Sequence, residues 1–381
     1  MHGSARWIFS VVFAVVLGLV VPVGEVQAAP TGGSGGALID RTFLAFTGTQ
    51  GSSQYHLFAG GLDWSKEVGL LIYADGSGEY GLKNPTSGYL LGGTTGLVAV
   101  AKQHNMILLT PLAPGGDCPD GGGTCWYQTS GGLTPTQKAQ WSYELAQQVK
   151  TQYSIDTDRI AFGGYSSGAQ WATEYFGPLY ASTLMSGGVA VAISYGGAPL
   201  VTPTFTPTHK ATVAYVWDTG SNDPAYASTG NYGVQGGHAW YARNGFTTEL
   251  HVVPGQDHSR SGQFGPILDR EITDHVPSAG PSVSQAGFQA NTGTLWTAGT
   301  LGTADTRLGM RPRTSPSLVV VPGGYQVAFQ ANTTSLWVTG ALGTQDLGLG
   351  MMPGTSPSIT ALPGGYQVAF QANTTSLWVT G

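Results

Sequence analysis

The sequence predicts an α/β domain built on a mainly parallel sheet, followed by a smaller all-β segment. Two observations predict the first part. Between residues 55 and 275, short apolar runs alternate with helical ones, and the apolar runs lack the polar alternation of strands that face water on one side. The second part is predicted by a repeat: beyond residue 277 the chain recurs with a period of 41 residues and has few positions that suit a helix.

The first 29 residues have the features of a secretory signal peptide. Arg6 precedes a nearly continuous apolar stretch over residues 7–23, and small residues at Ala28 and Ala29 offer a cleavage site. A membrane anchor is the less favoured interpretation, because the stretch is short and ends in glycine and proline. No later segment has the roughly 20 apolar residues that a membrane span needs. We therefore expect a secreted, extracellular protein without a membrane span after processing.

Composition restricts the expected partners. Charged residues are only 9% of the chain and the formal net charge is −6, whereas nucleic acids and anionic membranes are bound by clustered lysine and arginine. Neither is expected as a partner. The only two cysteines, Cys118 and Cys125, are expected to form a disulfide in an exported protein. The alternative, a metal site at these cysteines, lacks a histidine or further thiol nearby.

Within the α/β domain, placed at residues 55–277 after a lead-in at 30–54, the elements follow in order. Six apolar runs predict strands, at residues 69–74, 106–112, 159–163, 189–195, 212–217 and 249–253. The clearest helix covers residues 135–153. There Thr134 and Gln137 have the spacing of a capping box, and Pro135 occupies the first turn.

Ser166 is the predicted nucleophile. It is the centre of Gly164-Tyr165-Ser166-Ser167-Gly168, between a strand-like run and a helix-like run over residues 169–176. A sharp turn from strand to helix needs glycine on both sides and lifts the serine hydroxyl clear of the sheet. Ser34 is the centre of a second such match, but it follows no strand and lies in a flexible Gly/Ser stretch. We discount it.

A serine hydroxyl needs a histidine to take its proton and an acid to orient that histidine. His258 is the predicted base because it lies in the loop after the last expected strand, whereas His251 falls within that strand and His238 within a helix. Asp223 is the favoured acid, since it lies several residues past the preceding strand and can reach across to His258. Asp218, which ends that strand, stays the alternative.

The oxyanion of the reaction requires two backbone N–H donors. Ser167, directly after the nucleophile, is expected to supply one. The loop after the first strand is expected to supply the other from Gly76 or Ser77, because glycines there let the backbone approach the substrate carbonyl. The alternative is that this loop is only a tight turn.

Residues 55–275 resemble secreted α/β-hydrolase-fold esterases related to polyhydroxybutyrate depolymerases and feruloyl esterases. The resemblance rests on Tyr153 to Ile160 leading into the serine motif, on Gly220-Ser221-Asn222-Asp223, and on Gly255-Gln256-Asp257-His258. It implies the α/β-hydrolase fold and ester hydrolysis. Family members usually carry His-Gly after the first strand, whereas this chain has Asp75-Gly76 in the loop that is expected to supply the second oxyanion donor. The sequence has no metal-binding or nucleotide-binding motif, and the chemistry requires no cofactor and no metal.

The repeats occupy residues 278–381. Their recurring positions are Phe288, Phe329 and Phe370; Trp296, Trp337 and Trp378; and Asn291, Asn332 and Asn373. Each unit is predicted as strand, Asn-Thr turn, strand and a Gly/Pro-rich connection. The units look like the lectin-type β-propeller repeats attached to some secreted actinobacterial hydrolases, which implies a polysaccharide or cell-surface ligand. With about two and a half units, we expect either association with other chains or marginal order.

Two functions follow from these observations. The leading one is a secreted serine hydrolase that cleaves carboxylic esters, small or polymeric, through an acyl-enzyme. The alternative is a non-catalytic hydrolase-fold protein that binds glycans or surfaces through its repeats. The sequence does not specify the acyl or the alcohol group.

Overall fold

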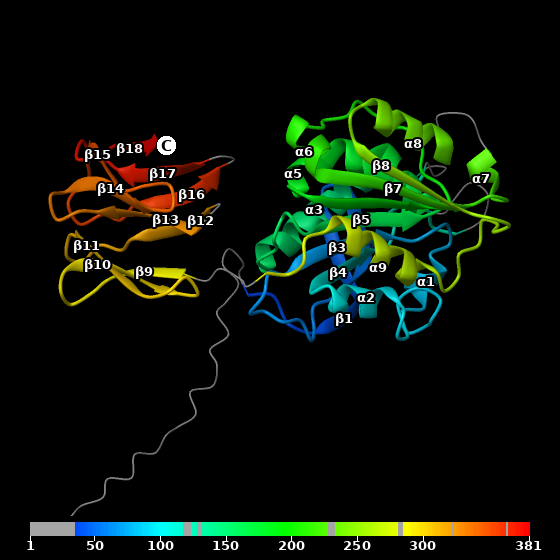
Figure 1. The fold of residues 1–381 in the computed structure, drawn as a ribbon, viewed down its shortest axis with the longest axis horizontal. Coiled ribbons are helices and arrows are strands. Elements are labelled where there is room, and N and C mark those ends of the chain that lie inside the picture. Colours follow the sequence, from blue (N-terminus) through cyan, green and yellow to red (C-terminus); the bar gives the residue numbers. More distant parts are fainter. Residues whose placement is uncertain are drawn as a thin grey trace, which may run out of the picture.

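The computed structural model describes residues 35–116, 123–127, 132–227, 233–280, 285–321, 324–362 and 365–381. Its larger part is one eight-stranded sheet with the strand order β1-β2-β4-β3-β5-β6-β7-β8 (Figure 1). The strands are β1 (Asp40–Gly48), β2 (Gly51–Phe58), β3 (Gly69–Ala74), β4 (Met106–Pro111), β5 (Ile160–Tyr165), β6 (Gly188–Ile193), β7 (Val213–Gly220) and β8 (Thr247–Val253). Strands β3 to β8 run parallel, and β2 is antiparallel to both neighbours. This is the α/β-hydrolase arrangement that the sequence predicted.

The sheet extends further upstream than the sequence indicated. Strands β1 and β2 add an antiparallel hairpin at its edge. Strand β1 lies within residues 30–54, which the sequence analysis left as a lead-in, and β2 continues from there into the start of the predicted domain. The reason is that β1 lies at the edge of the sheet and alternates between exposed and half-buried positions. It therefore lacks the continuous apolar run by which buried strands such as β3 and β4 are recognised.

Helices cover both faces of the sheet, as Figure 1 shows. They are α1 (Tyr80–Lys83), α2 (Leu97–Gln103), α3 (Pro135–Gln152), α4 (Ser167–Gln170), the π-helix η1 (Trp171–Ala181), α5 (Ser182–Leu184), α6 (Pro207–Thr212), α7 (Pro224–Ala227), α8 (Val234–Arg243) and α9 (Phe264–His275). One core contains side chains of α3, η1 and α8 and the other contains side chains of α2 and α9. The predicted capping box at Thr134 and Gln137 is present. Among the described residues, no helix has the length and apolarity to cross a membrane.

The remaining strands form three small antiparallel sheets (Figure 1). The first contains β9 (Gln285–Gln289), β10 (Thr294–Gly299) and β11 (Ala304–Gly309). The second contains β12 (Ser317–Val321), β13 (Gly324–Gln330), β14 (Ser335–Gly340) and β15 (Gln345–Gly350), and the third contains β16 (Ser358–Leu362), β17 (Gly365–Gln371) and β18 (Leu377–Thr380). The Gly/Pro-rich connection of the central unit thus includes strands that the sequence did not suggest. Strand β12 contacts both β9 and β16, so neighbouring sheets pack on one another.

The repeated side chains of this segment have identifiable roles. Gln326 and Gln330 are buried, and their side-chain amides donate to the carbonyl oxygens of Gly343 and Met352, each at 2.9 Å. Phe329 is also fully buried in the core between sheets. In the central unit these repeated residues therefore serve packing and hydrogen bonding, whereas the equivalent Phe288 of the first unit is exposed.

Candidate active site

Ser166 directly follows β5, in a backbone conformation that side-chain-bearing residues rarely adopt. Its φ is 53° and its ψ is −115°, and its N–H donates to the carbonyl oxygen of Ile193 at the end of β6, at 2.9 Å. Such a conformation costs about 1–3 kcal/mol and persists where the surroundings enforce it. The turn from β5 to α4 therefore keeps the position of the Ser166 side chain at a cost in the stability of the folded protein.

The glycines on either side of the serine are required by close approach of backbones. A Cβ atom added to Gly164 would lie 2.5 Å from the carbonyl oxygen of Ala74, and one added to Gly168 would lie 2.1 Å from the same oxygen. Neither contact is sterically possible. Because Ala74 ends β3, both glycines let the start of α4 sit directly against the neighbouring strand.

The structure brings Ser166, His258 and Asp223 together. Nε2 of His258 lies 3.0 Å from Oγ of Ser166, and Nδ1 of His258 lies 3.0 and 3.1 Å from the two carboxylate oxygens of Asp223. The serine hydroxyl, the imidazole and the carboxylate therefore form one continuous hydrogen-bonded chain. This is the order of contacts in which a histidine can take a serine proton while an acid fixes its tautomer.

Two adjacent loops hold the acid and the base at this distance. The loop after β7 carries Asp223 and the loop after β8 carries His258. The N–H of Asn222 donates to the carbonyl oxygen of Gln256 at 2.9 Å, and the N–H of Gly255 donates to Oγ of Ser221 at 2.8 Å. The loops are thus joined by hydrogen bonds of their own, so the acid–base distance does not depend on the triad contacts alone.

Asp223 and His258 differ in exposure as their suggested roles require. Asp223 is fully buried, whereas 39% of the His258 side chain is exposed. Burial raises the pKa of Asp223, but hydrogen bonds from His258 and from the amide of Ala225 outweigh that effect and bring the pKa below its usual value. The carboxylate therefore stays ionised at neutral pH, and the imidazole remains open to a substrate.

Asp218, the alternative acid, has other partners. Its side chain is buried and pairs with the guanidinium groups of Arg260 and Arg270, the latter at 2.8 Å. It lies within β7 (Val213–Gly220), before the loop that contains Asp223. Its carboxylate is thus occupied in holding arginines of the β8–α9 region, and the structure places Asp223 at the histidine.

The three predicted oxyanion donors differ in how free their amides are. Ser167 begins α4, where the first amides of a helix have no partner within that helix. Gly76 lies against the nucleophile, since an added Cβ would be 3.3 Å from that of Ser166, but its N–H donates to Oδ1 of Asp75 at 2.8 Å. No hydrogen bond of the Ser77 amide occurs in the described part of the chain. Ser77 is therefore the free donor of this loop.

Asp75 occupies the position at which the resembling family carries histidine. The side chain is buried, and its second oxygen accepts from the amide of Gly81 at 2.9 Å. Burial raises the pKa of Asp75 to about 6, although hydrogen bonds from Gly76, Gly81 and Leu82 lower it. The Asp75 carboxyl group thus anchors the start of α1 and contacts the turn beside Ser166.

Residues 123–127 are tied to the same turn. Oγ1 of Thr124 donates to the buried carboxyl group of Glu79 at 2.7 Å, and the N–H of Gly78 donates to the Thr124 carbonyl oxygen at 2.8 Å. Lys138 reaches from α3 to the carbonyl oxygens of Cys125 and Tyr127. The predicted disulfide involves Cys118, which lies outside the described residues, so it stays a prediction.

The aromatic residues near the nucleophile are mainly part of the core. Trp126 and Trp171 are fully buried, with ring centroids 5.2 Å apart.

The helix-like run predicted over residues 169–176 proves to be the end of α4 followed by the wider π-helix η1, which contains Pro178. On η1, burial raises the pKa of Glu174 to about 8, and the amide of Gly197 donates to it at 3.0 Å. Sequence reasoning did not single out this buried carboxyl group.

A second set of polar side chains was also missed. Glu249 and His251 on β8 meet Glu271 on α9, close enough to share an ion. The sequence signal was a pair of spacings, Glu-x-His in a strand and Glu-x-x-x-His from Glu271 to His275 in a helix. Each spacing places two ligands on one face. We had set His251 aside as the base only because it falls within the expected strand.

No protein-family model and no curated protein matches the chain. Solved structures do resemble it. A feruloyl esterase module from Clostridium thermocellum, complexed with sinapinate, is 15% identical over 71% of this chain and 95% of its own length, with a TM-score of 0.41. A thermostable esterase is 16% identical over 62% of this chain and 63% of its own, with a TM-score of 0.44. A lidless α/β serine hydrolase from Xanthomonas campestris is 12% identical over 63% of this chain and 94% of its own length, with a TM-score of 0.39. Likenesses this distant establish no activity.

Proposed function

We propose that the protein is an exported serine hydrolase that cleaves carboxylic esters through an acyl-enzyme intermediate. The observation that carries the proposal is the hydrogen-bonded chain from Ser166 through His258 to Asp223. It occurs at a strained turn whose two glycines are sterically required. A serine side chain has no structural need for such an arrangement, whereas nucleophilic catalysis requires it.

The proposed reaction uses the triad and the two oxyanion donors. As Oγ of Ser166 bonds to the ester carbonyl carbon, its proton passes to Nε2 of His258, and the carbonyl oxygen becomes an oxyanion. The Asp223 carboxylate stabilises the imidazolium that forms. The amides of Ser167 and Ser77 donate to the oxyanion. Collapse breaks the bond to the alcohol, which leaves with the proton from His258. A water molecule then repeats the sequence and releases the acid and the free serine.

Covalent labelling separates this enzyme from a non-catalytic binding protein. A fluorophosphonate reacts with a serine only where a base and an oxyanion site activate it. We expect stoichiometric labelling of the folded full-length protein, and peptide mass spectrometry should locate the adduct at Ser166. Pretreatment with heat should abolish the labelling. Folded protein that remains unlabelled at Ser166 would favour the non-catalytic alternative.

We further propose that the repeat segment binds a glycan or a polymer surface. A pocket lies between the first two sheets and is lined by Arg307, Gly309, Phe329, Asn332 and Trp337, among others. Arg307 and Asn332 are exposed, and Trp337 is half-buried. An aromatic ring beside exposed hydrogen-bonding groups offers stacking for a sugar ring and donors for its hydroxyls. Repetition of the unit suits weak sites that act together.

Replacement of Asn332 tests this binding role. Asn332→Ala removes an exposed amide from the pocket and keeps the backbone N–H that donates to the Gly309 carbonyl oxygen at 3.0 Å. We expect the variant to fold, to hydrolyse soluble esters as the wild type does, and to be retained less on insoluble polysaccharide in a pull-down assay. Unchanged retention across a panel of polysaccharides and polyesters, together with unchanged turnover, would count against a ligand at this pocket.

A further inference from the structure

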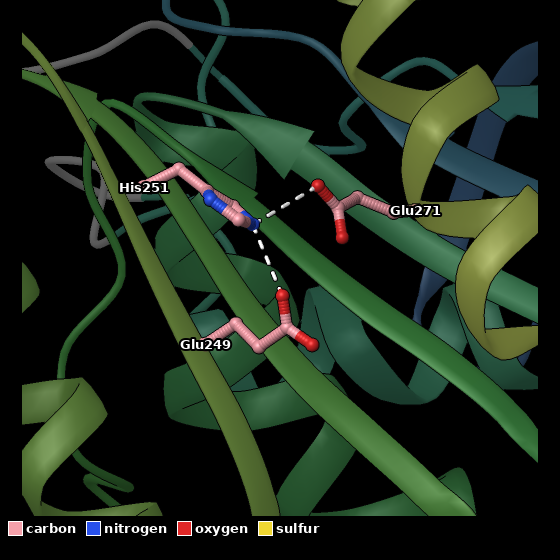
Figure 2. A group of neighbouring side chains, drawn as sticks. All are labelled: Glu249, His251 and Glu271. Atoms are coloured by element: carbon pink, nitrogen blue, oxygen red, sulfur yellow. Dashed lines mark ion pairs between the residues drawn. The ribbon is translucent and has the colours of Figure 1, made fainter.

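Four side chains that the proposed reaction does not use converge between β8 and α9. Figure 2 shows Glu249 and His251 on the strand and Glu271 on the helix, with the imidazole facing both carboxylates. Nε2 of His251 lies 3.2 Å from Glu249 and 3.5 Å from Glu271. His275, one turn beyond Glu271, places its own Nε2 3.2 Å from Glu249 and 3.7 Å from Glu271. Each histidine therefore faces both carboxylates.

Although these histidine and glutamate side chains lie close together, several of their polar atoms form no hydrogen bond within the described part of the chain. Nε2 of His251, Nε2 of His275 and Oε2 of Glu271 are all buried and have no hydrogen-bond partner in the part of the chain that the structure describes. The Glu271 side chain is completely buried. Each such atom carries a desolvation penalty that no hydrogen bond offsets. Three buried electron-pair donors without hydrogen bonds in one cluster indicate that a cation belongs among them.

The separations fit a tetrahedral metal centre. Zinc binds imidazole nitrogen and carboxylate oxygen at about 2.0–2.2 Å, so neighbouring ligand atoms of a tetrahedral site lie about 3.3–3.6 Å apart. The distances from His251 to the two glutamates, 3.2 and 3.5 Å, are close to this edge length. The imidazole of His251 with the carboxylates of Glu249 and Glu271 also forms a donor set suited to zinc rather than to calcium or magnesium, which prefer oxygen ligands alone.

The surrounding charges leave room for a cation. Arg270 donates to Oε1 of Glu271 at 2.6 Å and also pairs with Asp218, which in turn pairs with Arg260. Three carboxylates and two guanidinium groups therefore meet here, and with neutral imidazoles the cluster carries one negative charge. Arg270 pairs with Oε1 of Glu271, the oxygen that lies 3.5 Å from His251, while the buried Oε2 of Glu271 has no hydrogen-bond partner among the described residues.

We propose that Glu249, His251 and Glu271 bind a structural zinc ion, with His275 orienting the two carboxylates from beside them. The ion joins β8 to α9, the two elements that flank the loop of His258. Arg270, Asp218 and Arg260 continue the connection into that loop. The zinc site is distinct from the triad. Its function is therefore to fix the position of the loop that carries His258, and it takes no part in ester cleavage.

Zinc binding to tag-free full-length protein tests the proposal. After removal of metals with a chelator and return to buffer, we expect one zinc ion per chain by elemental analysis. We also expect an increase in Tm of at least about 5 °C on addition of zinc, because the ion binds the folded state. His251→Gln should weaken zinc binding at least about tenfold and abolish the increase in Tm. Glu249→Gln, at a more exposed ligand, is expected to have the same effect should His251→Gln fold poorly.

His238→Gln is the matched control. His238 lies on α8 and contacts Thr248, next to Glu249 in β8, but is not part of the cluster. This variant should bind zinc and gain stability as the wild type does. Wild-type protein that binds no more zinc than His251→Gln, or whose Tm does not respond to zinc, overturns the proposal. The cluster would then be a set of ion pairs with a protonated histidine. Fluorophosphonate labelling of Ser166 does not depend on either result.

Discussion

Ser166→Ala should abolish ester hydrolysis and leave the protein folded. The substitution removes the only atom that can form the acyl-enzyme, so that only binding and the oxyanion donors remain. Losses of roughly 10³-fold or more in kcat are expected when the nucleophile of such a site is removed. The measurement is turnover of a chromogenic short-chain ester, with Tm and circular dichroism recorded on the same samples.

Stability should change little in this variant. Oγ of Ser166 contacts His258 and contributes nothing to the core, and alanine at a φ of 53° is no more strained than serine. Ser34→Ala is the matched control, since Ser34 is the centre of the other G-x-S-x-G match but no strand is predicted before it from the sequence. Near-normal turnover in Ser166→Ala would refute the assignment, and loss of activity in Ser34→Ala would place the nucleophile elsewhere.

The parts of the fold that could be predicted are those in which burial leaves a local pattern. Strand β3 is buried along its whole length, and its boundaries match the predicted residues 69–74. The edge strand β1 shows the opposite: half its positions face water, so its sequence resembles a loop. The wider turns of η1 also leave no local signal, because a π-helix differs from an α-helix in which backbone groups pair and not in the kind of residue it contains.

The candidate site divides in the same way. Ser166, Asp223 and His258 could be predicted because parallel strands end at one edge of the sheet, and chain order then restricts which loops meet there. The state of the Gly76 amide could not be predicted, since it depends on a rotamer of Asp75. The cluster of Glu249 and Glu271 escaped notice because its two spacings are separated by the base loop and only packing of α9 on the sheet joins them.

Asp223→Asn should lower kcat by about 10³–10⁴-fold while the nucleophile and base stay in place. An amide of the same shape can keep the contact to Nδ1 of His258 but cannot stabilise an imidazolium, and its NH₂ group favours the wrong tautomer. The ionised state of Asp223 is maintained by hydrogen bonds that outweigh the effect of burial on its pKa. Turnover of a soluble ester at neutral pH measures the loss, and fluorophosphonate labelling should slow in parallel.

Asp218→Asn distinguishes the two acids because the structure assigns them opposite consequences. Asp218 is buried against the equally buried Arg260, and removal of one partner leaves a charge uncompensated at a cost of about 3–5 kcal/mol. The variant should therefore melt about 6–20 °C lower, yet its folded molecules should retain turnover within a few-fold of the wild type at temperatures below the transition. Asp223→Asn should show the reverse, with little loss of Tm and a large loss of turnover. If Asp218→Asn instead loses activity while folded and Asp223→Asn keeps it, the acid of the triad is Asp218, and the loop after β7 must rearrange before catalysis.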